Sequence, residues 1–215
     1  LRCNAIVAKV SIADPECKMT MPKKVLDYVT IDALCHNIEA YTSKIAQPLT
    51  DAMSIHAIEL IANNLVSVYN GTGSKKEWEN ITMASTIGGM VINTAGVTIA
   101  HGMEHPASGL KDIVHGQGLA ALTPIVIEAS YKGNEEKFAK IAKIFGGESA
   151  ADCADKIREL LKSIDLECKL SDLGIAAEDI SWMAENCMKV SAASIANNPV
   201  VFTQEEIAEL YRKAL

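Results

Sequence analysis

Apolar residues recur in this chain mostly at the spacing of a helix. Within one such segment they stand at Ile55, Ile58, Ile61 and Leu65. Side chains three or four residues apart share one face of an α-helix, and burial of that face stabilises it. Hydrophobic residues make up 49% of the 215 residues but aromatic residues only 5%, so aliphatic side chains must fill the core. A chain of this length can bury one substantial core, and we predict an all-α fold.

Start and stop signals divide the chain into expected elements. The segment before Asp14-Pro15 is rich in β-branched residues and is predicted to be extended over residues 1–20. Proline at position 106 disfavours helix at His105, so residues 106–114 are expected to form a loop that returns His115 to the earlier histidines. Helices are predicted over residues 22–29, 32–41, 48–65, 75–94, 96–104, 119–131, 135–145, 149–164 or 152–164, 179–190 and 203–214.

Four of the five histidines lie in two short stretches. Asp32 and His36 are four residues apart, as are His101 and His105, and His115 follows shortly after. Residues at this spacing share a helix face. Imidazole nitrogens together with a carboxylate oxygen suit Zn²⁺ or Fe²⁺, so the pattern favours a divalent-metal site.

Simpler interpretations of these residues stay open at this point. The histidines could be ordinary buried or surface residues, and Asp32 could be a charge at a helix N-terminus. His115-Gly116 could be a helix end with a glycine cap. His56 stands alone on an apolar helix pattern, which is typical of a structural core histidine, and we predict that it is not a ligand.

Charge and hydropathy exclude several classes of protein. The formal net charge is −7 and no basic stripe is present, which disfavours a nucleic-acid partner. No uncharged apolar run is long enough for a membrane span, and no signal-peptide pattern occurs. We therefore expect a cytoplasmic protein without a membrane partner.

The residues of the two histidine stretches also carry a family resemblance. The segments Ile31–Tyr41, His101–Gly109 and Asp112–Ala120 resemble the iron-containing alcohol dehydrogenases, a metal-dependent group related in fold to dehydroquinate synthase. The resemblance implies four ligands of Fe²⁺ or Zn²⁺, namely Asp32, His36, His101 and His115. It also implies that His105 is the family's additional histidine, near the nicotinamide and the substrate.

The resemblance further implies how this chain is organised. Family members have an N-terminal α/β domain that binds the dinucleotide, but this chain has no Gly-x-Gly-x-x-Gly turn. We therefore expect a multi-helix C-terminal domain, with residues 1–20 as an extended inter-domain connector and residues 21–215 as the helical metal-binding catalytic domain. NAD or NADP would be bound mainly by the absent N-terminal domain.

The implied function is that of an NAD(P)-dependent alcohol dehydrogenase. Its metal would polarise the oxygen of a small alcohol or aldehyde for hydride transfer to nicotinamide, and His105 would relay a proton. The chain alone is expected to be inactive, and a homo-oligomer is possible. Two alternatives stay open: a same-fold metal enzyme of other chemistry, resembling dehydroquinate synthase, which has a glutamate where Asp32 stands, and a metal-binding domain without turnover.

Overall fold

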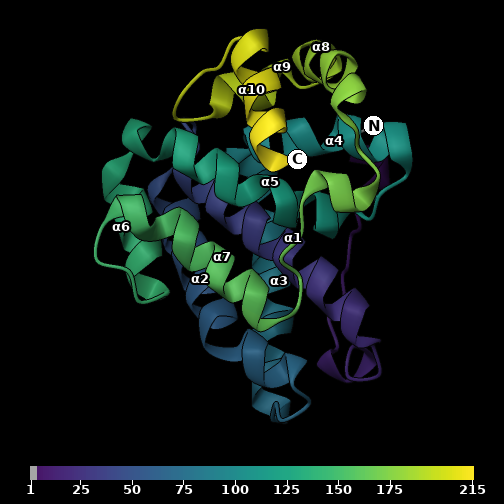
Figure 1. Ribbon diagram of the computed structural model, residues 1–215. Coiled ribbons are helices and arrows are strands. Elements are labelled where there is room, and N and C mark those ends of the chain that lie inside the picture. The colour runs from purple at the N-terminus through teal and green to yellow at the C-terminus, as the bar shows by residue number, and fades with distance from the viewer. Residues whose placement is uncertain (1–3) are drawn as a thin grey trace.

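The computed structural model describes residues 4–215 (Figure 1), and these residues form helices and turns without any β-strand. The all-α prediction is therefore confirmed for this part of the chain. The α-helices are α1 (Lys23–Thr42), α2 (Pro48–Tyr69), α3 (Lys75–Ala95), α4 (Ile99–Lys111), α5 (His115–Ser130), α6 (Glu135–Ile144), α7 (Cys153–Ser163), α8 (Ile180–Val190), α9 (Ala192–Asn197) and α10 (Gln204–Ala214).

Helices α1 and α5 lie at the centre of the packing. Helix α1 packs against α2, α3 and α5, whereas α5 also contacts α4, α7 and α10. Figure 1 shows the turn that joins α2 to α3 at the bottom of the molecule and α8, α9 and α10 at the top. Aliphatic side chains fill the core between them, including the fully buried Ile58, Ile61, Leu65, Leu119 and Leu122. Burial of this apolar surface drives the folding of the domain.

One continuous helix replaces two predicted ones near the N-terminus. We predicted separate helices over residues 22–29 and 32–41, but α1 runs through both segments. Thr30 and Ile31 lie at the expected break, are each only 2% exposed, and no glycine or proline interrupts the helix there. Asp32 therefore lies in the middle of a helix, which excludes its interpretation as an N-terminal helix charge.

Helix α4 also extends further than predicted. We expected residues 106–114 to be a loop, but the helix continues through Pro106 to Lys111. A proline inside a helix leaves the carbonyl four residues earlier without its N–H donor. Here that carbonyl belongs to Gly102, and it accepts a hydrogen bond from Ser191 Oγ at 3.1 Å. The next carbonyl, of Met103, accepts one from the Tyr211 hydroxyl at 2.5 Å.

The beginning of α5 likewise differs from the prediction. We expected this helix to start at Leu119, but it starts at His115, so only residues 112–114 join it to α4. Asp112 has a left-handed backbone with φ 53°, which ends α4 and turns the chain. His115 is therefore the first residue of a helix.

The N-terminal segment is extended only in part. Short 3₁₀ turns occur at Asn4–Ile6 and Pro15–Cys17, and the first three residues of the prediction lie outside the described residues. Large apolar side chains of this segment are exposed by 68% to 89%, namely Ile6, Val7, Val10 and Ile12. Its role as a connector stays a prediction.

No single helix in the described residues is long and apolar enough to cross a membrane. Helices α3 and α4 are long and apolar enough only when taken together, and the chain bends by 104° between them.

Replacing Ser191 by alanine is expected to destabilise the domain by about 1 to 3 kcal/mol, because the buried Gly102 carbonyl then loses its side-chain donor. Urea unfolding of the purified protein measures this change. In the Pro106→Ala background the backbone N–H of residue 106 becomes available to the Gly102 carbonyl. Ser191→Ala should therefore lower the free energy of unfolding by less in that background. An equal cost in both backgrounds would contradict this account of the helix.

Candidate metal centre

Three helices bring the predicted ligand residues together. Helix α1 carries Asp32 and His36, α4 carries His101 and His105, and α5 begins at His115. One carboxylate oxygen, Asp32 Oδ1, is the meeting point. It lies 3.2 Å from His101 Nε2, 3.4 Å from His36 Nε2 and 3.6 Å from His115 Nε2.

This arrangement has the dimensions of a site for one ion. Ligand atoms of Asp32, His101 and His115 all lie within 4.8 Å of one another. His36 completes the group from the side, where its ring stacks on that of His101 with the centroids 4.6 Å apart. Three imidazole nitrogens and one carboxylate oxygen form a donor set that fits Zn²⁺ or Fe²⁺. The residues present therefore fit the predicted metal.

A close approach of two backbones places His115 in this group. The first turn of α5 crosses α1 at Tyr28, where a Cβ atom on Gly116 would lie 2.3 Å from the Tyr28 carbonyl oxygen. Only glycine allows this approach. Tyr28 is one helical turn before Asp32 on α1, so the crossing brings His115 beside that carboxylate. Gly88 of α3 similarly packs close to Ala33 and Asn37 of α1, whereas its neighbour Gly89 faces open space.

Two buried glutamates hold the far side of the imidazole rings. Glu39 Oε1 lies 2.5 Å from His101 Nδ1, and its other oxygen accepts hydrogen bonds from the backbone and side chain of Thr98. Glu104 accepts a hydrogen bond from His115 Nδ1. The exposed fractions of Glu39 and Glu104 are 3% and 0%. Both glutamates bond Nδ1, which leaves Nε2 of each ring facing Asp32.

The sequence interpretation assigned these two glutamates no role. A signal for them was nevertheless present, because Glu39 and Glu104 lie inside the same two histidine motifs as the predicted ligands. A metal-bound histidine usually donates its second N–H to a carboxylate or a carbonyl. A search for acidic residues within two helical turns of each histidine would have found both.

Opposing charges shift the protonation equilibria of this cluster. Burial tends to lower the pKa of His101 and of His115, but the adjacent carboxylates outweigh it and raise these pKa values to about 10 and about 9. Burial tends to raise the pKa of Asp32, and hydrogen bonds from His101 and His115 overcome this and lower it. Without a metal, the two imidazoles therefore hold protons between ionised carboxylates.

His105 lies at the edge of the cluster. It is exposed, and its ring stacks on that of His115 with a centroid distance of 5.7 Å. Burial and the neighbouring charge of His101 lower the pKa of His105, so this imidazole loses its proton at a lower pH than those of His101 and His115. The position suits the predicted proton relay.

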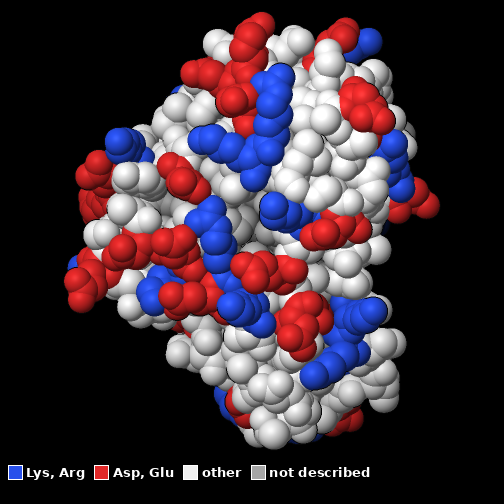
Figure 2. Space-filling model, viewed as in Figure 1, with Lys and Arg blue, Asp and Glu red and all other residues white. Residues whose placement is uncertain are grey.

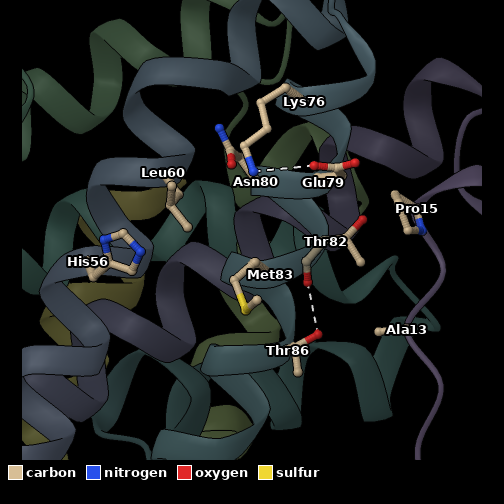
Figure 3. Close-up of a pocket in the computed structure, with 10 residues that line it drawn as sticks. All are labelled: Ala13, Pro15, His56, Leu60, Lys76, Glu79, Asn80, Thr82, Met83 and Thr86. Atoms are coloured by element: carbon tan, nitrogen blue, oxygen red, sulfur yellow. Dashed lines mark hydrogen bonds and ion pairs between the residues drawn. The ribbon is translucent and has the colours of Figure 1, made fainter.

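A separate surface hollow of about 570 Å³ lies between the N-terminal segment and helices α2 and α3 (Figure 3). None of the predicted ligands lines it. His56 does, and its side chain is 59% exposed and 4.0 Å from Glu59, so the prediction of a core position for His56 is wrong. It lies opposite the face of α2 that buries Ala57, Ile58 and Ile61. The structure leaves it outside the histidine cluster.

The fold and the cluster together define a helical domain built around a group of donor atoms that suit a divalent metal. Residues 28–215 match the profile of the Fe-containing alcohol dehydrogenase family, C-terminal part. This chain therefore belongs to that family, as the resemblance of its histidine motifs indicated.

Individual relatives agree with this assignment. The chain is 38% identical over 213 residues to the 1,3-propanediol dehydrogenase of Citrobacter freundii, covering 95% of this chain and 54% of that protein. An archaeal halo-thermophilic alcohol dehydrogenase from a Red Sea brine pool superposes with a TM-score of 0.90 at 32% identity, over 96% of this chain and 55% of that one. The iron-containing alcohol dehydrogenase of Thermococcus thioreducens superposes with a TM-score of 0.89 at 32% identity, over 99% of this chain and 56% of that one. This chain spans about half the length of these relatives.

Metal binding to the cluster is expected to tighten as the pH rises. Only neutral imidazole ligates a metal, so at about pH 7 each ion must displace the protons of both His101 and His115. Below their raised pKa values of about 9 and about 10, the association constant for Zn²⁺ should rise up to about 100-fold per pH unit. Competition titrations with a chromogenic chelator at several pH values measure this slope. An affinity that does not change with pH would contradict the proton exchange.

Removal of one ligand should abolish stoichiometric binding. His101→Ala and His115→Ala each delete a nitrogen from the cluster, and we expect metal content to fall sharply in both. His56→Ala is the matched control, because this exposed histidine lies outside the cluster, and it should retain the metal. Elemental analysis of anaerobically purified protein gives the comparison, and equal metal content in all three variants would exclude the site.

Proposed function

We propose that this chain is the metal-binding catalytic part of an NAD(P)-dependent alcohol dehydrogenase, with Fe²⁺ or Zn²⁺ held by Asp32, His36, His101 and His115. The convergence of three imidazoles on one oxygen of Asp32 is the observation that supports it most. When bound, the metal supplies a Lewis acid that polarises the oxygen of an alcohol or aldehyde for hydride transfer to nicotinamide.

The protein side chains set up the site before substrate arrives. Glu39 and Glu104 orient His101 and His115 through their Nδ1 atoms, so little reorganisation accompanies ligation. The site is asymmetric in its access to solvent. His101 is buried, whereas the side chain of His115 is 38% exposed and that of Asp32 is 29% exposed. Substrate would approach from this open side.

His105 is proposed to accept the proton that the alcohol loses. It lies on the open side beside His115, and its lowered pKa keeps the imidazole neutral and able to accept a proton near neutral pH. Because the side chain is exposed, it can pass that proton to water. His101 and His115 cannot share this role, since both nitrogens of each ring are engaged, one with Asp32 and one with a glutamate.

The other partners follow from the family and from the surface. Because the relatives are about twice as long, we propose that an N-terminal α/β domain binds NAD or NADP, and the exposed apolar residues 6–12 support a connector to it. Figure 2 shows acidic and basic side chains interspersed over the visible face. With the net charge of −7, this favours a small alcohol or aldehyde substrate over nucleic acid. We further propose a cytoplasmic location and a homo-oligomer.

An assay of the full-length protein tests this function. Protein loaded anaerobically with Fe²⁺ or Zn²⁺ should reduce NAD⁺ or NADP⁺ with small primary alcohols, among them 1,3-propanediol, the substrate that the name of one relative indicates. Residues 1–215 alone should bind the metal but reduce neither cofactor, because the nicotinamide site is incomplete. Metal binding by the full-length protein without turnover of any alcohol would favour a domain without dehydrogenase activity.

Replacing His105 separates proton transfer from metal binding. In the full-length enzyme, His105→Ala should keep its metal and lower kcat by about 100-fold or more, because a positioned general base typically contributes that much. The pH dependence of kcat should also change. Metal analysis alongside the pH–rate profile tests both statements, and a loss of metal equal to that in His101→Ala would make His105 a ligand.

A further inference from the structure

We propose that Glu104 is a positioning residue that fixes His115 for metal binding, an inference that rests on the metal centre of the proposed function. Its carboxylate would hold the imidazole in the one orientation and tautomer that presents Nε2 to the metal. Metal affinity would then depend on a residue that does not itself touch the ion.

His115 is the ligand that most needs such a partner. It is the first residue of α5 and follows a three-residue connection, and its side chain is 38% exposed. His101 is 3% exposed and His36 stacks on it, so packing already restricts both rings. An exposed imidazole at the start of a helix keeps rotamer freedom that ligation must remove. A hydrogen bond to Nδ1 removes that freedom beforehand.

Glu104 is itself held from several sides. It is fully buried, and one oxygen accepts a hydrogen bond from Ser108 Oγ, a hydroxyl that also lies 3.2 Å from the Ile113 carbonyl oxygen. Gly118 of α5 leaves the space that the carboxylate fills, because a Cβ atom there would lie 2.8 Å from both Cγ and Oε1 of Glu104. The glutamate therefore links α4, the connection after it, and α5.

The same arrangement occurs a second time in the cluster. Glu39 bonds Nδ1 of His101 and is fixed by Thr98, as Glu104 bonds Nδ1 of His115 and is fixed by Ser108. In both cases Nε2 faces Asp32 Oδ1, at 3.2 Å and 3.6 Å. An Nδ1–H that donates to a carboxylate leaves the lone pair on Nε2. Both carboxylates thus select the same tautomer.

A second cation site is the competing interpretation. Ligand atoms of Glu104, His105 and His115 also lie within 4.8 Å of one another. However, both oxygens of Glu104 are already engaged, one by His115 and the other by Ser108. A cation between Glu104 Oε2 and His115 Nδ1 would have to break the hydrogen bond that joins them, at a fully buried carboxylate, which is costly. The positioning role requires no such change.

Cobalt titration of the metal-free full-length protein tests the proposal. Glu104→Ala should weaken Co²⁺ binding about 10- to 100-fold, the usual effect of removing such a partner. Glu104→Gln keeps an acceptor oxygen and should recover most of the affinity. Glu136→Gln is the matched control, because Glu136 is an exposed helical glutamate that forms an ion pair with Lys140 outside the cluster, and this variant should bind Co²⁺ as the wild type does. Far-UV circular dichroism establishes that each variant is folded.

Nitrogen-15 NMR of the histidine rings gives a readout that a loss of stability would not produce. In the metal-free wild type at high pH, Nδ1 of His115 should carry the proton, whereas in metal-free Glu104→Ala at the same pH His115 should show a mixture of tautomers. Glu104→Gln should retain the wild-type tautomer.

Three results would overturn the proposal. The first is a Glu104→Ala affinity within about twofold of the wild type, well below the usual effect, with the tautomer unchanged. The second is binding of two Co²⁺ ions by the wild type and one by Glu104→Ala, which would make Glu104 a ligand. The third is a wild type that binds no Co²⁺, or that binds it equally after His101→Ala, and this result alone would also remove the proposed metal centre.

Discussion

The contact between the Asp32 carboxylate and three imidazoles requires the rest of the structure to balance the charges of these groups. Four ionisable groups meet at one oxygen, and such a group is stable in a folded protein only when its charges are balanced. Protons on His101 and His115 provide that balance without a metal, and a divalent cation can provide it in their place. Two protons on the imidazoles and one divalent cation would therefore add the same positive charge to the cluster.

Each helix that supplies a ligand is held in place by a different device. Helix α1 is a single buried rod, and α5 reaches it only because Gly116 allows backbone contact at Tyr28. Helix α4 keeps its course through a proline because Ser191 occupies the carbonyl that the proline leaves free. The geometry of the site thus depends on two unusual local features, the close backbone contact at Gly116 and the proline inside α4.

The sequence predicted the parts of this site that depend on local spacing. Asp32 with His36, and His101 with His105, share helix faces because they are four residues apart, and the structure places them so. The extension of α4 through Pro106 could not be predicted, because its compensating donors lie 89 and 108 residues away along the chain. The place of Glu104 between His101 and His105 was visible in the sequence, but its pairing with His115 was not, since that pairing depends on how α5 folds back.

That separation along the chain has a consequence for the order of assembly. All the predicted ligands lie at or before residue 115, but the hydroxyl that bonds the carbonyl left free by Pro106 belongs to Ser191, 89 residues beyond Gly102. The chain must therefore be synthesised almost to its C-terminus before α4 has both of its side-chain donors, Ser191 and Tyr211.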